Sequence, residues 1–231
     1  MNRLPIEAVV LDMDGLLIDT EPVWREAEAA VFAALGIELT DEELLGTTGQ
    51  TIDAVIPVWR EREPDHDGET PRLTDAEVEA RIVDLVAAHV RAEGEPMPGV
   101  VQAIALLQRL GLHLAIASSS PRRMIDAVCE RLGLDFIEVR CSAMEEARSK
   151  PAPDVYLAAA RRLGVSPERC LAIEDSPSGV VSARAAGMRC IAVPDPLLVG
   201  DPRYREANLL LAALTELDEA AMLSVLRAGA S

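Results

Sequence analysis

The sequence predicts an α/β fold in which helices cover both faces of a parallel β-sheet, with a small helical domain inserted after the first strand. Three observations support this prediction. Short, continuous apolar runs of strand length recur along the chain. Glycines follow segments whose apolar residues have helical spacing. A stretch between about Thr20 and Pro98 contains helical patterns alone. Because continuous apolar strands alternate with helices elsewhere, the sheet is expected to be parallel and buried on both faces.

The predicted strands are five apolar runs. They span residues 6–11, 112–117, 136–141, 170–173 and 188–193. Predicted helix ends are marked by glycine, which readily adopts the left-handed conformation that often follows a helix. These glycines are Gly36, Gly111, Gly133, Gly164 and Gly187. After four of the five comes a strand or a short link to one, which is the alternation typical of a parallel sheet.

The interval after the first strand is predicted to form a helical lid. Helical patterns span residues 22–35, 51–62 and 74–91, and a polar link at 63–71 separates the last two. The loop at 19–21 and the turn at 96–99 bound the lid. We therefore expect a core domain of residues 1–18 and 96–231 and a helical cap of residues 19–95.

Length and charge exclude several classes of protein. The 231 residues suit one domain, or one domain that carries a modest insertion. The net charge of −17 argues against nucleic acid, which is bound by basic patches that neutralise phosphates. No run approaches the roughly 20 apolar residues that cross a bilayer, and the N-terminus leads into a strand pattern rather than a signal peptide. We expect a cytoplasmic monomer that binds neither nucleic acid nor membranes.

The cysteines and histidines do not form a metal motif. They are Cys129, Cys141, Cys170 and Cys190, and His66, His89 and His113. Their spacings match neither a CxxC pair nor an HExxH helix. The sequence therefore indicates buried free thiols and no zinc site.

Three predicted strands are followed directly by groups that bind ions. Asp12 and Asp14 follow the first strand, Ser118–Ser120 follows the second, and Glu174 and Asp175 follow the fourth. Ligands of open parallel sheets lie beyond the carboxyl ends of the strands, so these groups are expected to meet at one edge.

This combination predicts a site for Mg²⁺ and a phosphoryl group. A turn at Gly15 can bring Asp12 and Asp14 together, and Glu174 and Asp175 could complete a shell of oxygen ligands around Mg²⁺. The serine hydroxyls and the N-terminus of a helix near Pro121 would bind phosphoryl oxygens. The alternative is that each acid caps a turn and each serine caps a helix. Capping explains any one of these clusters well, but it does not explain why all of them lie at strand ends.

Lys150 is the single lysine among 22 basic residues, the others being arginine. In a chain so rich in arginine, a lysine before a predicted helix indicates a position that needs a compact ammonium group rather than a planar guanidinium. The alternative is that one lysine is present by chance.

Four segments resemble, in order, the signatures of the haloacid dehalogenase superfamily. Residues 12–21, DMDGLLIDTE, resemble the first signature, DxDGxxxD(S/T)E. Ser118, Lys150 in the segment SKPAPD, and Glu174-Asp175-Ser176 resemble the second, third and fourth. One DxD pair is weak support for such a resemblance, but four signatures in order span essentially the whole chain.

The resemblance implies a Rossmann-like core with a helical cap, and phosphoryl transfer through a covalent intermediate. Asp12 would be the nucleophile and Asp14 the general acid and base. Asp12, the backbone carbonyl of Asp14 and Asp175, with Glu174 as a further candidate, would hold Mg²⁺. The phosphoryl group would be bound by Ser118, the amide of Ser119 and Lys150.

The resemblance also narrows the reaction. Members of the superfamily that remove halide lack an acid at the position of Asp14, so Asp14 indicates phosphate chemistry. The segments Glu21-Pro22-x-Trp24 and Leu45-Gly46…Ile56-x-Val58-Trp59 resemble phosphatases of hexose, deoxyhexose or hexitol phosphates. We expect a small phosphorylated sugar or polyol as substrate.

Two alternatives stay open. β-Phosphoglucomutase is similar, but it has a histidine where this chain has Trp24 and a basic residue in the loop that is here residues 46–50. A catalytically silent protein that binds a phosphorylated metabolite is the other alternative. Trp24 and Trp59 are equally compatible with substrate contact and with packing inside the cap.

Overall fold

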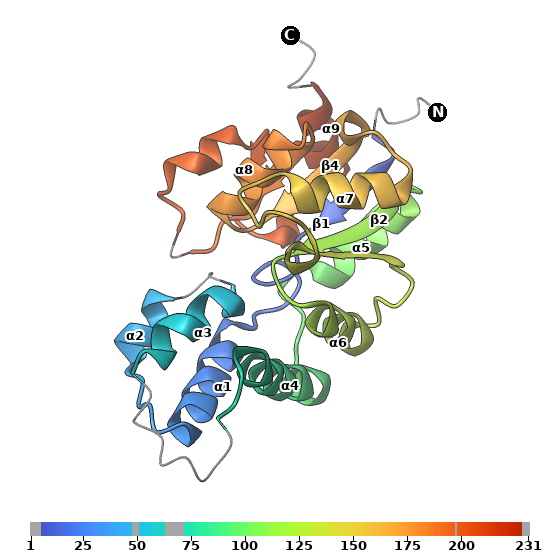
Figure 1. The fold of residues 1–231 in the computed structure, drawn as a ribbon. Helices are drawn as coiled ribbons and strands as arrows, with labels where there is room; N and C mark the ends of the chain where they lie inside the picture. Colours follow the sequence, from blue (N-terminus) through green and yellow to red (C-terminus); the bar gives the residue numbers. More distant parts are fainter. Residues whose placement is uncertain (1–5, 48–50, 63–71, 197, 228–231) are drawn as a thin grey trace.

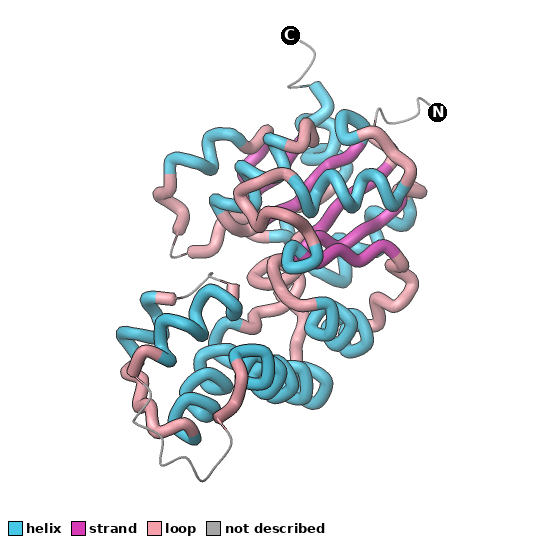
Figure 2. The backbone as a smooth tube through the Cα atoms, viewed as in Figure 1, coloured by secondary structure: helices cyan, strands magenta, loops and turns pink. Residues whose placement is uncertain are grey.

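The computed structural model describes residues 6–47, 51–62, 72–196 and 198–227. Its sheet has the strand order β3-β2-β1-β4-β5-β6, and all neighbouring strands are parallel. The strands are β1 (Ala8–Leu11), β2 (His113–Ser118), β3 (Val139–Ser142), β4 (Cys170–Glu174), β5 (Arg189–Ala192) and β6 (Leu209–Leu210). Helices lie on both sides of the sheet (Figure 2). The predicted α/β Rossmann-like fold is confirmed.

The two faces of the sheet differ in side-chain size. Val9 and Leu11 of β1 belong to one hydrophobic cluster, whereas Ala8 and Val10 belong to another that is rich in alanine. The first cluster packs against α5 (Val100–Arg109), α6 (Arg122–Leu132) and α9 (Glu219–Arg227), and the second against α7 (Asp154–Leu163) and α8 (Pro177–Ala185). Among the small side chains of the second cluster, Tyr156 of α7 is fully buried.

Four helices lie between β1 and α5 in the chain. They are α1 (Glu21–Ala34), α2 (Asp41–Gly46), α3 (Ile52–Arg60) and α4 (Asp75–Glu93). They form a group apart from the sheet, and α4 packs against α6 (Figure 1). The chain enters and leaves this group through neighbouring segments, because the Met97 amide donates to the Leu17 carbonyl at 2.9 Å and Ile18 pairs with Pro96.

Several predicted elements differ from those observed. The third strand begins at Val139 rather than at residue 136, because Ile137 N donates to Leu134 O at 2.9 Å and closes a turn. Phe136 in that turn is 48% exposed. Neither α2 nor β6 was predicted, since both are short. The predicted link at 63–71 and residues 48–50 of the cap loop lie outside the described residues.

Two other local predictions, the glycines at helix ends and the buried free thiols, are confirmed. The five glycines expected to end helices have φ values between 66° and 85°. All four cysteines are free and buried. Within the described parts of the chain, no helix combines the length and the apolar character needed to cross a membrane.

Candidate active site

The polar residues expected at the strand ends do meet at the carboxyl edge of the sheet. Asp12 follows β1, and its backbone N–H donates to Ile173 O of β4 at 2.9 Å. Ser118 and Glu174 are the last residues of β2 and β4, one residue further into the strands than predicted. Lys150 precedes α7. The parallel pairing of β1 with β2 and β4 brings these side chains together from distant parts of the sequence.

Lys150 lies at the centre of this group. Its Nζ donates to Asp12 Oδ1 at 2.5 Å, to Glu174 Oε1 at 2.6 Å and to the Ala117 carbonyl at 3.0 Å. The side chain is only 4% exposed. Three acceptors match the three protons of an ammonium group. Burial lowers the pKa of Lys150, but Asp12 and Glu174 outweigh it and raise the pKa above its usual value, so Lys150 stays charged.

Glu174 is held by donors from the protein on both oxygens. Oε1 accepts from Lys150 and from the Tyr156 hydroxyl at 2.7 Å. Oε2 accepts from the backbone N–H of Asp175 and from the backbone N–H and hydroxyl of Ser176, at 3.0–3.1 Å. With both oxygens bound in this way, Glu174 is well placed to fix Lys150.

Asp12, Glu174 and Asp175 form the buried carboxylate cluster, with one oxygen from each lying within 4.8 Å of the others. Burial first, and then the charge of Glu174, raise the pKa of Asp12 to about 8 despite the opposing effect of Lys150. Burial and the charges of Asp12 and Glu174 also raise the pKa of Asp175 well above its usual value. This cluster has more negative charge than Lys150 can offset, and its ligand atoms are all oxygen. Both properties fit a hard divalent cation such as Mg²⁺.

Asp14 is held apart from this cluster by hydroxyl groups. Its Oδ1 accepts from the Thr20 hydroxyl, and its Oδ2 accepts from the hydroxyls of Ser118 at 3.1 Å and Ser120 at 2.8 Å. Ser118 in turn accepts from the Ser120 backbone N–H at 2.9 Å. Gly15, with a φ of 80°, turns the chain directly after Asp14. The carboxyl group is therefore fixed in orientation by three donors.

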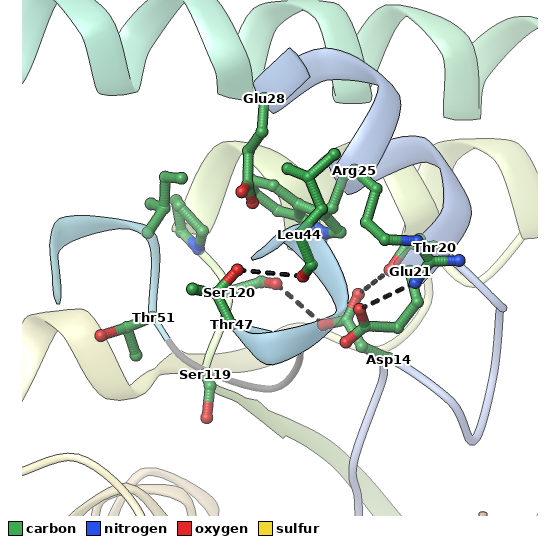
Figure 3. Close-up of a pocket in the computed structure, with 13 residues that line it drawn as sticks. Asp14, Thr20, Glu21, Arg25, Glu28, Leu44, Thr47, Thr51, Ser119 and Ser120 are labelled. Atoms are coloured by element: carbon green, nitrogen blue, oxygen red, sulfur yellow. Dashed lines mark hydrogen bonds and ion pairs between the residues drawn. The ribbon is translucent and has the colours of Figure 1, made fainter. Parts of the chain in front are cut away.

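A cavity of about 100 Å³ opens beside Asp14, between the strand ends and the inserted helices. The core side contributes Asp14, Ser119 and Ser120, and the helical side contributes residues of α1, α2 and the start of α3. Figure 3 shows Asp14, Thr20 and Ser120 pointing toward one another, whereas the Ser119 hydroxyl points away from them. A volume of this size holds several water molecules or a small polar group.

The two tryptophans have different environments. Trp24 of α1 is partly buried and lines the cavity. Trp59 of α3 is 8% exposed within the hydrophobic core, and its Nε1 has no partner among the described residues. The loop at residues 46–50 was expected to supply no basic side chain. Its Thr47 lines the cavity, and its residues 48–50 lie outside the described residues.

Sequence reasoning missed three side chains that orient the site. Thr20 and Ser120 bind Asp14, and both lay inside segments already singled out, the first signature and the serine triplet. Tyr156 donates to Glu174 from a buried helix face. At such a position the sequence suggests only hydrophobic packing, so the hydrogen bond was not predicted.

Known proteins share this architecture. A family model described as haloacid dehalogenase-like hydrolase matches residues 6–187. Hexitol phosphatase B of Escherichia coli (strain K12) is 42% identical over 215 residues, covering 92% of this chain and 94% of that protein. The crystal structure of CbbY from Rhodobacter sphaeroides in complex with phosphate has a TM-score of 0.81 at 32% identity, covering 94% of this chain and 99% of that one. A mutant of that CbbY in complex with xylulose-(1,5)bisphosphate has a TM-score of 0.80 at 33% identity, with the same coverage.

Proposed function

This chain belongs to the haloacid dehalogenase-like hydrolase family, and on that basis we propose that it hydrolyses monophosphate esters of small sugars or polyols through an aspartyl phosphate formed on Asp12. The 42% identity to a hexitol phosphatase supports this substrate class. The observation that carries the mechanism is the paired arrangement of two aspartates. Lys150 holds Asp12 at 2.5 Å, while three hydroxyls fix Asp14 beside the cavity.

In the first step, a carboxylate oxygen of Asp12 attacks phosphorus and the bond to the ester oxygen breaks. Asp14 gives the carboxyl proton to the departing alcohol oxygen. Lys150, the Ser118 hydroxyl and the Ser119 backbone N–H are the proposed ligands of the phosphoryl oxygens. Their positive charge and hydrogen bonds offset the negative charge of the transferring group.

In the second step, Asp14 takes a proton from water as the water oxygen attacks phosphorus. The bond between phosphorus and the Asp12 oxygen breaks, which releases inorganic phosphate and regenerates the Asp12 carboxylate. A single carboxyl group serves both steps because the first leaves it deprotonated.

Mg²⁺ is the proposed cofactor, held by Asp12, Asp175 and the backbone carbonyl of Asp14. When bound, the ion offsets negative charge on the phosphoryl oxygens. Glu174, whose two oxygens already accept from protein donors, would act mainly by positioning Lys150. Residues 19–95 are the proposed cap, and residues 1–18 and 96–231 the proposed catalytic core.

Trp24 favours hydrolysis over isomerisation. Trp24 lines the cavity but cannot exchange a proton near neutral pH or carry a positive charge. Because position 24 offers no such group to delay Asp14, we expect water to reach the aspartyl phosphate. The expected products of a hexitol 6-phosphate are the hexitol and one equivalent of phosphate. Conversion of β-glucose 1-phosphate to the 6-phosphate without free phosphate would instead identify a mutase.

The test uses two variants and a matched control, assayed with Mg²⁺. Asp12→Asn should abolish turnover of both an aryl phosphate and a hexitol phosphate, because an amide cannot form the aspartyl phosphate. Asp14→Asn should impair the hexitol phosphate more than the aryl phosphate, whose leaving group needs little protonation. Asp135→Asn, an exposed substitution before β3 at the opposite edge of the sheet, should leave both rates unchanged. Activity near that of the wild type in Asp12→Asn would refute the mechanism, and an inactive wild type would favour the silent binding protein.

A further inference from the structure

Glu28 is a buried carboxyl group for which the proposed reaction has no task. The residue is 8% exposed, and its Oε2 is buried without a hydrogen-bond partner among the described residues. Buried acceptors of this kind destabilise a fold unless a donor reaches them. The side chain therefore has an unmet hydrogen-bonding capacity.

The Glu28 side chain lines the cavity beside Asp14. Glu21, Trp24, Arg25 and Glu28 lie at positions i, i+3, i+4 and i+7 of α1, and all four line the cavity from one helix face. In Figure 3 the Glu28 carboxyl group points from α1 into the cavity, toward the side on which Ser120 lies.

Asp14 and Glu28 line this cavity from its two sides. In the proposed mechanism Asp14 protonates the ester oxygen, so the alcohol part of the substrate extends from Asp14 into the cavity. The groups it would meet on the helical side include Glu28 Oε2, an acceptor that has no donor in the described part of the chain. The hydroxyl groups of a sugar or polyol are such donors.

We propose that Glu28 is a specificity-determining residue that accepts hydrogen bonds from hydroxyl groups on the alcohol part of the substrate. This inference rests on the proposed phosphatase activity and adds to it the group that recognises the alcohol. A substrate without hydroxyl groups would leave Glu28 unpaired and would gain nothing from it.

The charges around the cavity favour a neutral alcohol part. Glu21 and Glu28 of α1 are acidic, and Arg25 is the basic residue among the described residues that line the cavity. Arg25 already lies 3.8 Å from Glu21. A second phosphate or a carboxylate on the substrate would face this acidic surface. Hexitol and hexose monophosphates should therefore be preferred to sugar bisphosphates and to phosphorylated acids.

The experiment compares two substrates across matched variants. A hexitol 6-phosphate presents hydroxyl groups to Glu28, whereas p-nitrophenyl phosphate presents none. Glu28→Leu should lower kcat/KM for the hexitol phosphate by about tenfold or more, mainly through a higher KM, because a binding contact is lost. Turnover of p-nitrophenyl phosphate should change by less than about twofold. Glu28→Gln should show a smaller loss, since its amide oxygen still accepts a hydrogen bond.

Glu26→Gln is the matched control, because it removes the same charge from an exposed position of α1. Deoxy analogues give a second measurement. For the wild type, one deoxy analogue should be a poorer substrate than its parent. For Glu28→Leu, the same analogue and its parent should be equally good substrates. The hydroxyl group missing from that analogue is then the one that Glu28 binds.

Two results would overturn the inference. Equal losses for both substrates in Glu28→Leu and Glu28→Gln would mean that Glu28 acts through the fold, and no loss for the hexitol phosphate would mean that it does not contact the substrate. The proposed function fails in a different way. In that case the wild type itself would cleave p-nitrophenyl phosphate and no hydroxylated monophosphate.

Discussion

At the scale of single residues, the site depends on an ammonium group surrounded by three oxygen acceptors. Lys150 reaches Asp12, Glu174 and the Ala117 carbonyl within 3.0 Å. A guanidinium group is larger and planar, and cannot direct one charge between two carboxylates in a space of this size. Lysine is absent elsewhere in the chain, and the environment of Lys150 is one that suits an ammonium group.

We predict that Lys150→Arg is nearly as damaging as Lys150→Ala, with a loss in kcat of about 100-fold or more, as for removal of a group that stabilises a transition state. Steady-state rates with an aryl phosphate measure this effect. Arg148→Lys is the matched control, since it makes the reverse exchange at an exposed position two residues away and should leave the rate unchanged. An arginine variant that keeps most of the activity would show that the lone lysine is an accident of composition.

Glu28 also makes a prediction about stability. Burial and the charge of Glu21, opposed by Arg25, raise the pKa of Glu28 to about 7 from 4.5. Between these two values the folded state keeps a proton that the unfolded state releases, so this residue makes stability fall as pH rises from about 4.5 to 7. Glu28→Gln removes that contribution. Its melting temperature should therefore rise relative to that of the wild type across this range and then level off.

Thermal melts of both proteins at several pH values test this prediction. Glu26→Gln is the matched control, because it replaces a carboxyl group at an exposed position of the same helix. A difference between Glu28→Gln and the wild type that does not change with pH would contradict the raised pKa.

At the scale of elements, the start of α8 is built around Glu174. Gly179 lies in the first turn of α8, where a Cβ atom would approach Glu174 Oε1 to 1.7 Å. Glu174 cannot move aside without breaking its bonds to Lys150, Tyr156 and the α8 N-terminus. A glycine at this position therefore lets the helix begin directly over the site.

Gly179→Ala should lower the free energy of unfolding by about 1–3 kcal/mol, as overpacking does, and should reduce kcat by displacing Glu174 and with it Lys150. Denaturant unfolding and the rate with an aryl phosphate measure the two effects. Gly46→Ala in α2 is the matched control, because its Cβ would meet no atom of the described residues within 4 Å. A stable and fully active Gly179→Ala would show that Glu174 is not fixed as described.

At the scale of the whole molecule, a cation bound to the carboxylate cluster would link its binding to folding. Asp12, Glu174 and Asp175 come from two strand ends and are buried together, which destabilises the folded chain in proportion to their charge. A cation that binds only the folded state relieves this repulsion and stabilises the protein by mass action.

We predict that Mg²⁺ at 100 times its Kd stabilises the fold by about 2.7 kcal/mol, or roughly 5–10 °C in melting temperature. EDTA should abolish activity. Ca²⁺ should inhibit the enzyme, because Ca²⁺ prefers more ligands in a looser shell than Mg²⁺ does. Asp175→Asn should lose the Mg²⁺-induced rise, whereas Asp135→Asn should keep it. Full activity after exhaustive chelation would refute the metal assignment.

The fold class, and the edge of the sheet that carries the candidate site, could be predicted from the sequence alone. Apolar runs reveal buried strands, and parallel strands place their carboxyl ends together, so Asp12, Ser118 and Glu174 had to meet. Composition indicated that position 150 needs a compact ammonium group, and the contacts of Lys150 in the structure suit the same group. Strand ends were predicted to within a residue for β2 and β4, but the turn at Phe136 was not, because an apolar residue in a turn follows no local pattern.

Which partner each polar group takes depends on how distant segments pack together. Lys150 and Asp12 are separated by 138 residues, and Ser120 and Asp14 by 106, so no local spacing encodes their contact. Tyr156 reaches Glu174 because alanines on one face of the sheet leave room for a large side chain. Glu28 lies on α1 among residues of the cavity lining, and its Oε2 is buried without a partner among the described residues because neighbouring elements cover it. Burial and close approach are properties of packing between distant segments, which a pattern along the chain does not contain.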